Sequence, residues 1–379
     1  MKIIVLGAGL VGAPMVFDLA QDNNFIVTVA DKSAQALSKF SSHPHIHTVQ
    51  QDLSDAEMLK TLVANHDMVL SAVPGFMGFE TLKALIEAGK NVVDIAFFPE
   101  DLFQLDDLAK KNNVTVISDM GVAPGMSNVL IGYADNKLET TDKVAIYVGG
   151  LPKERLWPYE YKAVFSPVDV IEEYTRPARY IENGKQVIKP ALSDPELLNF
   201  PVIGTLEAFN SDGLRSLAQT IRCPNMIEKT LRYKGHIEKM AMLRETGFFD
   251  KEPVEINGTM ISPLDFTSKL LFPKWKLEKG EEDITIMRII VEGKIQNKSL
   301  RYTFDLYDTY NAETGVHSMA RTTGYTATMA LRMIARGLYT QKGVSAPEFV
   351  GKDNSCVDFL LKGLAERGVV YQQNREILE

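Results

Sequence analysis

A glycine-rich turn near the start of the chain has the spacing that dinucleotide-binding proteins use. Its glycines, Gly7, Gly9 and Gly12, follow a β-prone run and precede a helical one. Gly7 permits the sharp turn, Gly9 lets the backbone approach a pyrophosphate, and Gly12 lets the helix pack closely on the strand. The unpaired N–H groups at the helix N-terminus, around Leu10 and Val11, would face the phosphates. The turn therefore predicts a bound dinucleotide.

An acid follows this turn at the distance where such folds contact the adenosine ribose. Asp31 stands about 20 residues after Gly12, at the end of a second β-prone run. Its carboxylate would accept hydrogen bonds from the ribose hydroxyls and repel a 2′-phosphate, so we expect NAD. Lys32 beside it keeps NADP possible. The strand ends expected to line the same cofactor are Asp52 and the turn of Ala72, Val73 and Pro74.

Two further acids close the fifth and sixth expected strands, on the side of the sheet where a nicotinamide should lie. Asp94 and Asp119 could each orient or deprotonate an amine, or instead cap the segment that follows. His236 opens a helix after Gly235 and could act as a general acid or base, or only bond to backbone. We predict Asp119 and His236 as catalytic residues and Asp94 as a substrate-binding residue.

Arginines cluster in the second half of the chain, where an amino-acid substrate would need a partner for its carboxylate. They are Arg176, Arg179, Arg215 and Arg232. A guanidinium can hold a carboxylate through two parallel hydrogen bonds, although most arginines lie on surfaces. Glycine and polar residues flank Arg215 and Arg232, so these two are predicted to bind the substrate.

Composition and motifs exclude several other classes of protein. A net charge of −8 argues against nucleic acid and membrane partners, and no apolar run approaches the roughly 20 residues of a membrane span. His43, His45 and His47 lack further ligands at metal-binding spacing, so no metal is expected. Cys223 and Cys356 form no C-x-x-C pair, and a β-prone run begins at once, so we expect a cytoplasmic protein without a signal peptide. No G-x-S-x-G nucleophile motif occurs.

The elements that must position these residues change in kind along the chain. Alternating strands and helices over about the first 120 residues predict a doubly wound parallel sheet, whose ligands bind at the carboxyl ends of the strands. The expected strands are 2–6, 25–30, 46–50, 67–72, 91–95 and 114–118, with helices such as 57–65 and 78–88. The fold class is therefore α/β, with a Rossmann sheet.

Longer strands and hairpins are expected beyond residue 143, which predicts a second, mixed α+β domain. Asn183-Gly184 between β-prone flanks is typical of a hairpin turn. The expected strands are 144–149, 178–188 around that turn, 284–296 and 300–308, and the expected helices are 127–137, 216–222, 236–246, 318–336 and 353–367. Such a sheet suits substrate binding and dimerisation.

Four segments resemble the saccharopine dehydrogenase family. They are DMGVAPGMSN at 119–128, EEYTRPAR at 172–179, TLRYKGH at 230–236 and SMARTTGY at 318–325. With EKM and LRETGFF after His236, the last two look most like the L-lysine 6-dehydrogenase branch.

The resemblance implies an NAD(P)-binding Rossmann domain of residues 1–123 and 318–379, interrupted by a substrate-binding and dimerisation domain, 124–317. It also implies a homodimer that moves hydride between an amino-acid C–N bond and the nicotinamide. For lysine, the ε-carbon is oxidised and the imine is hydrolysed to the semialdehyde. The acidic and apolar segment 94–98 favours a compact amine. The alternatives are a saccharopine- or carboxynorspermidine-type imine reductase and a non-catalytic NAD-binding sensor.

Overall fold

The computed structural model describes residues 1–278 and 280–378. The chain divides into two compact units. Unit 1 comprises Met1–Glu139 and Met319–Tyr371, and unit 2 comprises Thr140–Ser318 and the residues from Gln372 onward. Residues 124–139, which the resemblance places in the inserted domain, lie in unit 1. No described helix has both the length and the apolar content needed to cross a bilayer.

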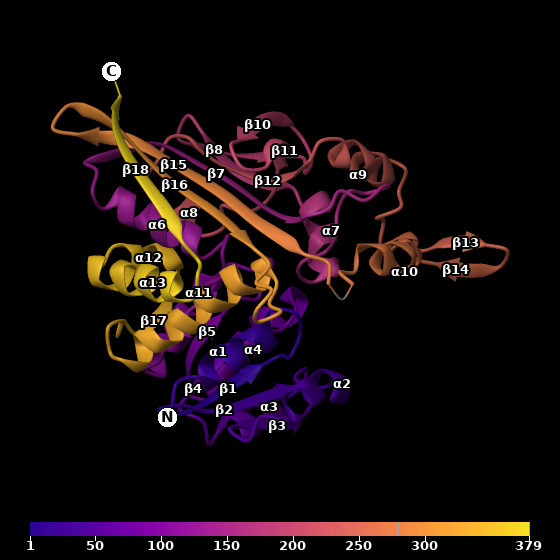
Figure 1. Cartoon of the computed structure of the whole chain (residues 1–379), viewed down its shortest axis with the longest axis vertical. Coiled ribbons are helices and arrows are strands. Elements are labelled where there is room, and N and C mark those ends of the chain that lie inside the picture. The colour runs from indigo at the N-terminus through magenta and orange to yellow at the C-terminus, as the bar shows by residue number, and fades with distance from the viewer. Residues whose placement is uncertain (279, 379) are drawn as a thin grey trace. The chain divides into compact units, whose positions relative to one another are not determined.

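Unit 1 is built on a seven-stranded sheet in the order β17-β6-β5-β4-β1-β2-β3 (Figure 1). Every neighbouring pair is parallel, as the Rossmann prediction requires. The strands are β1 (Lys2–Leu6), β2 (Ile26–Asp31), β3 (Ile46–Gln50), β4 (Met68–Ser71), β5 (Asn91–Asp94), β6 (Thr115–Ile117) and β17 (Gly343–Ser345). The first six confirm the predicted strands. β17 was not predicted, because three residues carry no readable period.

Helices connect these strands and cover their apolar side chains, such as Ile4, Val69 and Val92, all of which are fully buried. The helices of unit 1 are α1 (Gly12–Ala20), α2 (Ala34–Leu37), α3 (Ala56–Val63), α4 (Gly75–Glu87), α5 (Asp106–Lys111), α6 (Met126–Asp135), α11 (Ser318–Ala335), α12 (Pro347–Gly351) and α13 (Asn354–Glu366), with 3₁₀ turns η1 (Ser38–Phe40) and η2 (Leu102–Leu105). α11 begins at Ser318, the last residue of the segment assigned to unit 2. The α/β fold class is confirmed.

A buried ion network fixes the returning C-terminal helices of unit 1. Arg332 of α11 donates to Asp18 of α1 at 2.7 Å, and Arg367, which follows α13, donates to the other oxygen of Asp18 at 2.6 Å. The Thr328 hydroxyl donates to Asp18 as well. Because Asp18 is only 3% exposed, this carboxylate depends on its two guanidinium partners.

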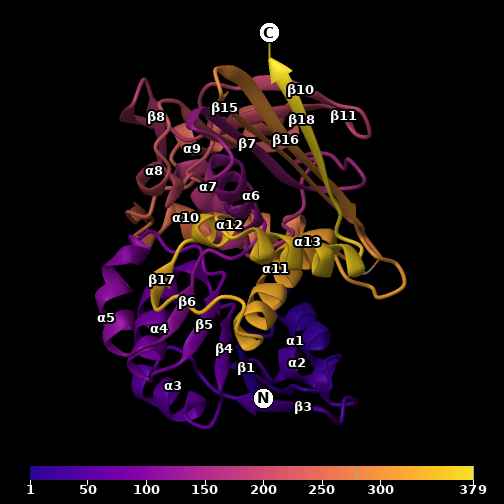
Figure 2. The ribbon, with the colours of Figure 1, turned by 90° about the vertical axis from the view of Figure 1, so that its left-hand side faces the viewer.

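Unit 2 contains a mixed nine-stranded sheet with the main order β10-β11-β12-β7-β15-β16-β18. β12 and β7 run parallel, whereas β7–β15, β15–β16, β11–β12 and β10–β11 are antiparallel pairs. The strands are β7 (Thr140–Pro152), β8 (Ala178–Glu182), β9 (Lys185–Lys189), β10 (Glu196–Phe200), β11 (Gly204–Asn210), β12 (Met226–Tyr233), β15 (Asp283–Ile295), β16 (Lys298–Thr309) and β18 (Tyr371–Leu378). Figure 2 shows the long strands β7, β15 and β16, which pair with one another in that order. β8 and β9 form the predicted hairpin around Asn183-Gly184.

Among the described residues of unit 2, four helices and a small hairpin complete the fold: α7 (Pro167–Thr175), α8 (Leu217–Thr220), α9 (His236–Glu245), α10 (Pro263–Trp275), and β13 (Val254–Ile256) with β14 (Thr259–Ile261). The aromatic residues Tyr174 and Trp275 pack with Ile237 in one buried cluster. Leu231 and Tyr233 of β12 belong to a different cluster. Because Leu231 and Tyr233 are two residues apart on one strand, they lie on the same face of the sheet.

Candidate functional site

The glycine turn of unit 1 has the geometry that a dinucleotide requires. Gly7 has a φ of 101°, in the region that favours glycine. A Cβ on Gly12 would lie 2.1 Å from the Gly7 carbonyl oxygen, so α1 can begin here only without a side chain. A Cβ on Gly9 would meet no described heavy atom within 4 Å. The exposed backbone at Gly9 thus leaves room for a phosphate beside the N-terminus of α1.

The other predicted cofactor residues surround this turn within unit 1. Both oxygens of Asp31 accept backbone hydrogen bonds, from the amides of Ala8 and Ser33, each at 2.7 Å. This fixes the carboxylate at the tip of β2 while further lone pairs remain to accept from ribose hydroxyls. Leu10 is half exposed and Val11 precedes the first residue of α1.

Asp52 and the turn after β4 occupy the neighbouring strand ends. Hydrogen bonds from the Ser54 amide and hydroxyl lower the pKa of Asp52, which is exposed after β3. The Ala72 amide continues the sheet by donating to Leu6, and Val73 and Pro74 lead directly into α4. These residues stay predicted cofactor contacts.

Asp94 and Asp119 lie at the carboxyl ends of the paired strands β5 and β6. Asp94 has no exposed surface, and its Oδ2 accepts a 3.2 Å hydrogen bond from Ser118. Burial raises the pKa of Asp94 to about 7; the Asp119 carboxylate adds to the rise, and the Ser71 and Ser118 hydroxyls oppose it. Two carboxyl groups at adjacent strand ends, with the pKa of Asp94 raised toward neutrality, have the arrangement that proton transfer requires.

Strand-end hydroxyls belong to this site and were not singled out from the sequence. Ser71 ends β4 and Ser118 follows β6, so they flank Asp94 on either side. Among the described residues, Ser71 Oγ and Asp94 Oδ1 make no hydrogen bond of good geometry, although both atoms are buried. The Ser71 hydroxyl still lies close enough to Asp94 to lower its pKa, so the two serines are the polar neighbours of this carboxyl group. Asp94 was identified in the sequence by its position at the carboxyl end of a strand, and the same signal could have identified these serines.

In unit 2, strand β12 presents a polar row, defined here as Glu228, Thr230 and Arg232, on one face. Arg232 is 2% exposed and donates to Glu173 at 2.6 Å and to the Leu231 carbonyl at 3.0 Å. Its guanidinium also lies 4.6 Å from the centre of the Tyr161 ring. Its Nε also donates to the Tyr174 hydroxyl at 3.4 Å, so all three of its nitrogens are engaged inside unit 2, which weakens its prediction as a substrate clamp.

His236 is buried beside this row, and both of its ring nitrogens are engaged. Nε2 lies 2.9 Å from the Tyr174 hydroxyl, and Nδ1 lies 2.8 Å from the Tyr159 carbonyl. Burial, together with the charge of Arg232, lowers the pKa of His236 to about 3. A neutral, enclosed imidazole is a poor proton acceptor. The geometry favours a packing role for His236 over the predicted catalytic one.

Arg215 lies on the loop that follows β11. It is 7% exposed and has a φ of 51°, a left-handed conformation that is costly for a residue other than glycine. The same loop contains Ser211 and Gly213, which both donate to Glu228 of the polar row. The structure therefore connects Arg215 to the polar row, which the sequence alone did not suggest.

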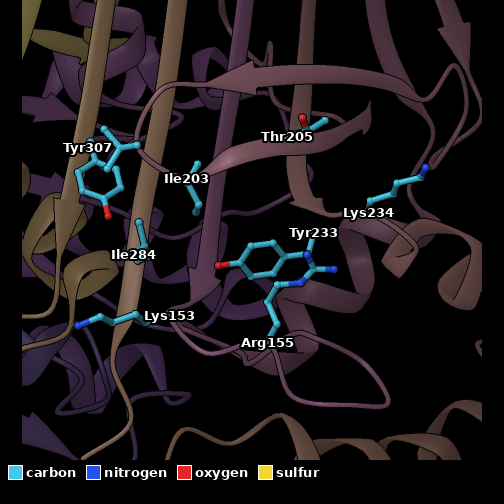
Figure 3. A pocket seen from close by; sticks show the side chains of 9 residues that line it. Lys153, Arg155, Ile203, Thr205, Tyr233, Lys234, Ile284 and Tyr307 are labelled. Atoms are coloured by element: carbon cyan, nitrogen blue, oxygen red, sulfur yellow. The ribbon is translucent and has the colours of Figure 1, made fainter.

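Unit 2 also carries an open groove of about 660 Å³, lined from strands β11, β12, β15 and β16 and from the segments that follow β7 and precede β11 (Figure 3). The Arg155 guanidinium stacks 4.8 Å from the centre of the Tyr233 ring. The groove is lined by Lys153, Arg155, Val202, Ile203, Thr205, Tyr233, Lys234, Ile284 and Tyr307. The predicted catalytic and substrate-binding residues are not part of this lining.

Sequence comparison decides the family. Residues 3–117 match the domain described as the saccharopine dehydrogenase NADP binding domain, and residues 121–369 match the saccharopine dehydrogenase C-terminal domain. The chain belongs to the saccharopine dehydrogenase family. The predicted family and the predicted NAD(P)-binding domain at the glycine turn are therefore confirmed.

Relatives within the saccharopine dehydrogenase family are distant. Mouse mitochondrial alpha-aminoadipic semialdehyde synthase is 25% identical over 91% of this chain, but the chain spans only 45% of that protein. A saccharopine dehydrogenase [NADP(+), L-glutamate-forming] from Pyricularia oryzae is 24% identical, with 97% of each chain covered. The apo saccharopine dehydrogenase (L-Glu forming) of Saccharomyces cerevisiae superposes with a TM-score of 0.81 at 19% identity, covering both chains fully. This last likeness shows that the fold is shared.

Proposed function

We propose that this saccharopine dehydrogenase family member is an NAD(P)-dependent oxidoreductase of an amino-acid C–N bond, with L-lysine, oxidised at its ε-carbon, as its substrate. The observation that carries the proposal is the edge of the unit 1 sheet. There the glycine turn and the two buried acids Asp94 and Asp119 occupy carboxyl ends of strands in one parallel sheet. In doubly wound sheets this edge is where the ligand binds.

The cofactor supplies a hydride acceptor, and the chain's own residues supply binding and proton transfer. The Gly9 backbone and the N-terminus of α1 would hold the pyrophosphate. Asp31 would accept from the ribose hydroxyls, which favours NAD. The Pyricularia oryzae relative named for NADP(+) is only 24% identical, so its name does not decide this preference.

We assign proton acceptance to Asp119. An amine must lose its proton before its carbon can release hydride, and a carboxylate at the strand edge can take that proton. When ionised, Asp94 would then hold the distal ammonium of the substrate, the one that is not oxidised. His236 is a weaker candidate because its ring is enclosed and neutral.

In unit 2 we assign the substrate's α-carboxylate to Arg215. Arg232 already pairs with Glu173, so its release for a substrate would leave a buried carboxylate unpaired. Arg215→Gln should raise the KM for an amino acid far more than it changes kcat. The reason is that the carboxylate is bound equally well in the ground state and in the transition state.

The cofactor site can be tested with matched glycine variants. Gly9→Ala should leave the thermal stability unchanged, since its Cβ meets no described atom, yet weaken NAD(P) binding by blocking the phosphate. Gly12→Ala should instead lower the melting temperature, because its Cβ would clash with the Gly7 carbonyl. Fluorescence titration with NADH and NADPH, beside a thermal melt, measures both effects. Unchanged binding in Gly9→Ala would contradict the assignment.

Saccharopine is the second candidate substrate. Relatives covered over nearly their whole length carry that name, whereas the sequence resemblance favours lysine. A panel of L-lysine, saccharopine and diamines with NAD or NADP, followed by reduced-nicotinamide absorbance, separates the two. Turnover of saccharopine but not lysine would select the second candidate, and cofactor binding without any turnover would indicate the sensor.

We further propose a homodimer formed through unit 2. Its strands and turns expose large apolar side chains, among them Ile188 at 69%, Leu197 at 54% and Val202 at 66%. Exposed apolar patches often mark protein interfaces. Light scattering after gel filtration should give twice the 42.2 kDa chain mass, and Leu197→Asp should shift it toward the monomer. A monomeric wild type would refute the dimer.

A further inference from the structure

Glu228 is a buried carboxyl of β12 that the proposed mechanism does not use. It is 4% exposed, and its Oε2 accepts from the Ser211 hydroxyl at 2.7 Å and from the Gly213 amide at 3.1 Å. Both donors lie on the loop that leads to Arg215. Glu228 therefore holds this loop by one side-chain contact and one backbone contact.

The loop of residues 211–215 packs closely against Glu228 and its neighbours. A Cβ on Gly213 would lie 2.3 Å from Glu228 Cδ, so the loop backbone packs directly against the carboxyl group. Ser211 also contacts Thr230 of the polar row at 2.7 Å. The next loop residue, Asp212, forms a two-point ion pair with Arg179 at 2.8–2.9 Å. Three consecutive residues are thus fixed before the chain reaches Arg215.

Arg215 needs such support because its backbone is strained. A φ of 51° places a long side chain in the left-handed region, a conformation that persists only when its surroundings enforce it. We propose that Glu228 is a positioning residue that holds loop 211–215 and thereby sets where the Arg215 guanidinium stands for the substrate's carboxylate. This proposal rests on the function assigned to Arg215 above.

The surroundings of Glu228 indicate which protonation state of its carboxyl group holds the loop. Burial raises its pKa to about 8, with the Glu173 and Asp212 carboxylates adding to the rise and Ser211 and Gly213 opposing it. Glu228 is then largely protonated at neutral pH, and a glutamine has the same shape with an acceptor oxygen. Glu228→Gln should therefore preserve the loop, whereas Glu228→Ala should release it.

The kinetic test compares lysine with pentane-1,5-diamine, which is lysine without its carboxylate. Glu228→Ala should raise the KM for L-lysine about tenfold, the loss of roughly one charge-assisted contact, while kcat and the KM for NAD stay near wild type. The inhibition constant of the diamine should not change, and Glu228→Gln should restore the KM. Thr175→Val, which removes a unit 2 hydroxyl bonded to the Ile171 carbonyl within α7 and not to the loop, is the matched control.

The outcomes separate this proposal from the function on which it rests. If Arg215→Gln fails to distinguish lysine from the diamine, the carboxylate assignment of Arg215 is wrong. Suppose instead that Arg215→Gln affects lysine and not the diamine. If Glu228→Ala then leaves both the KM for lysine and the inhibition constant of the diamine unchanged, or raises both equally, the positioning role of Glu228 is overturned. Crystal structures decide the matter without turnover: Arg215 should leave its left-handed conformation in Glu228→Ala and keep it in Glu228→Gln. An unmoved Arg215 in Glu228→Ala would refute the proposal.

Discussion

Asp18 and Asp94 are both buried carboxyl groups of unit 1, but their surroundings differ. Asp18 is held by Arg332 and Arg367, with a hydroxyl from Thr328. Among the described residues Asp94 has no cation beside it: the Ser118 hydroxyl donates to one of its oxygens, and the Ser71 hydroxyl and the Ala96 amide also lower its pKa. A carboxylate paired with two guanidinium groups is committed to structure. A carboxyl left without a cation can gain or lose a proton near neutral pH, which chemistry requires.

The largest expected effect comes from Asp18→Asn. Removing this charge leaves two guanidinium groups without their anion, and breaking a buried pair costs about 3–5 kcal/mol. Urea unfolding should show that loss, while kcat per folded molecule stays near wild type. Asp22→Asn is the control, since Asp22 lies 3.8 Å from Arg332 and remains partly exposed. If Asp18→Asn lowered the free energy of unfolding by less than about 1 kcal/mol, the structural role that separates Asp18 from Asp94 would be contradicted.

Stability should respond to pH through Asp94. Its pKa rises from 3.8 in an exposed chain to about 7 on burial, so between these values the folded state keeps a proton that the unfolded state has released. Stability therefore falls as pH rises from about 4 to 7, by about 1.4 kcal/mol per unit, and is level above that window. Asp94→Asn should remove this slope. Parallel stability curves for the wild type and the variant would contradict the raised pKa.

Enzyme activity should depend on Asp94 and not on Asp18, the reverse of what is expected for Asp18→Asn. Above pH 7 an ionised Asp94 can hold a cationic substrate, so kcat/KM of the wild type should rise through an inflection near pH 7. Asp94→Asn should lose about tenfold at pH 8.5, the value of a charged hydrogen bond, and little at pH 6. Initial rates across pH measure this. An unaltered profile in Asp94→Asn would exclude Asp94 from the site.

The smallest effect is expected from Ser118→Ala. The Ser118 hydroxyl lowers the pKa of Asp94, so its loss should move the inflection in kcat/KM to higher pH and cost about 1 kcal/mol of stability. Ser127→Ala, which removes a buried hydroxyl bonded to Asn128 instead, controls for the loss of a hydrogen bond alone. A shift of equal size in both variants would show that Ser118 has no particular influence on Asp94.

Much of the fold was predictable because its signals are local. β1 and β3 have the predicted bounds, since each is a short β-prone run next to a turn. The helix starts at Asp55 and Asp353 use side chains that cap the following amides. β17 escaped prediction because its three residues form a strand only by pairing with β6, more than 200 residues away.

The candidate site was predictable only in part, for the same reason. Asp94 and Asp119 follow from their place at strand ends, which sequence patterns reveal. The hydrogen bonds that engage Arg232 and His236 cannot be predicted from such patterns, because their partners Glu173 and Tyr174 lie about 60 residues earlier in the chain. The proposed role of Glu228 had a partial signal: Glu228, Thr230 and Arg232 place polar side chains at alternate positions of β12, on one face of the strand, although Lys229 between them is polar as well.

The central claim is that this chain oxidises an amino-acid C–N bond with a nicotinamide cofactor, and one measurement tests it most directly. Purified protein with L-lysine and NAD should produce reduced nicotinamide, followed by its absorbance, and Asp119→Asn should lower the rate by about 100-fold or more. No reduction of NAD or NADP with lysine, saccharopine or a diamine, in protein that binds the cofactor, would contradict the account.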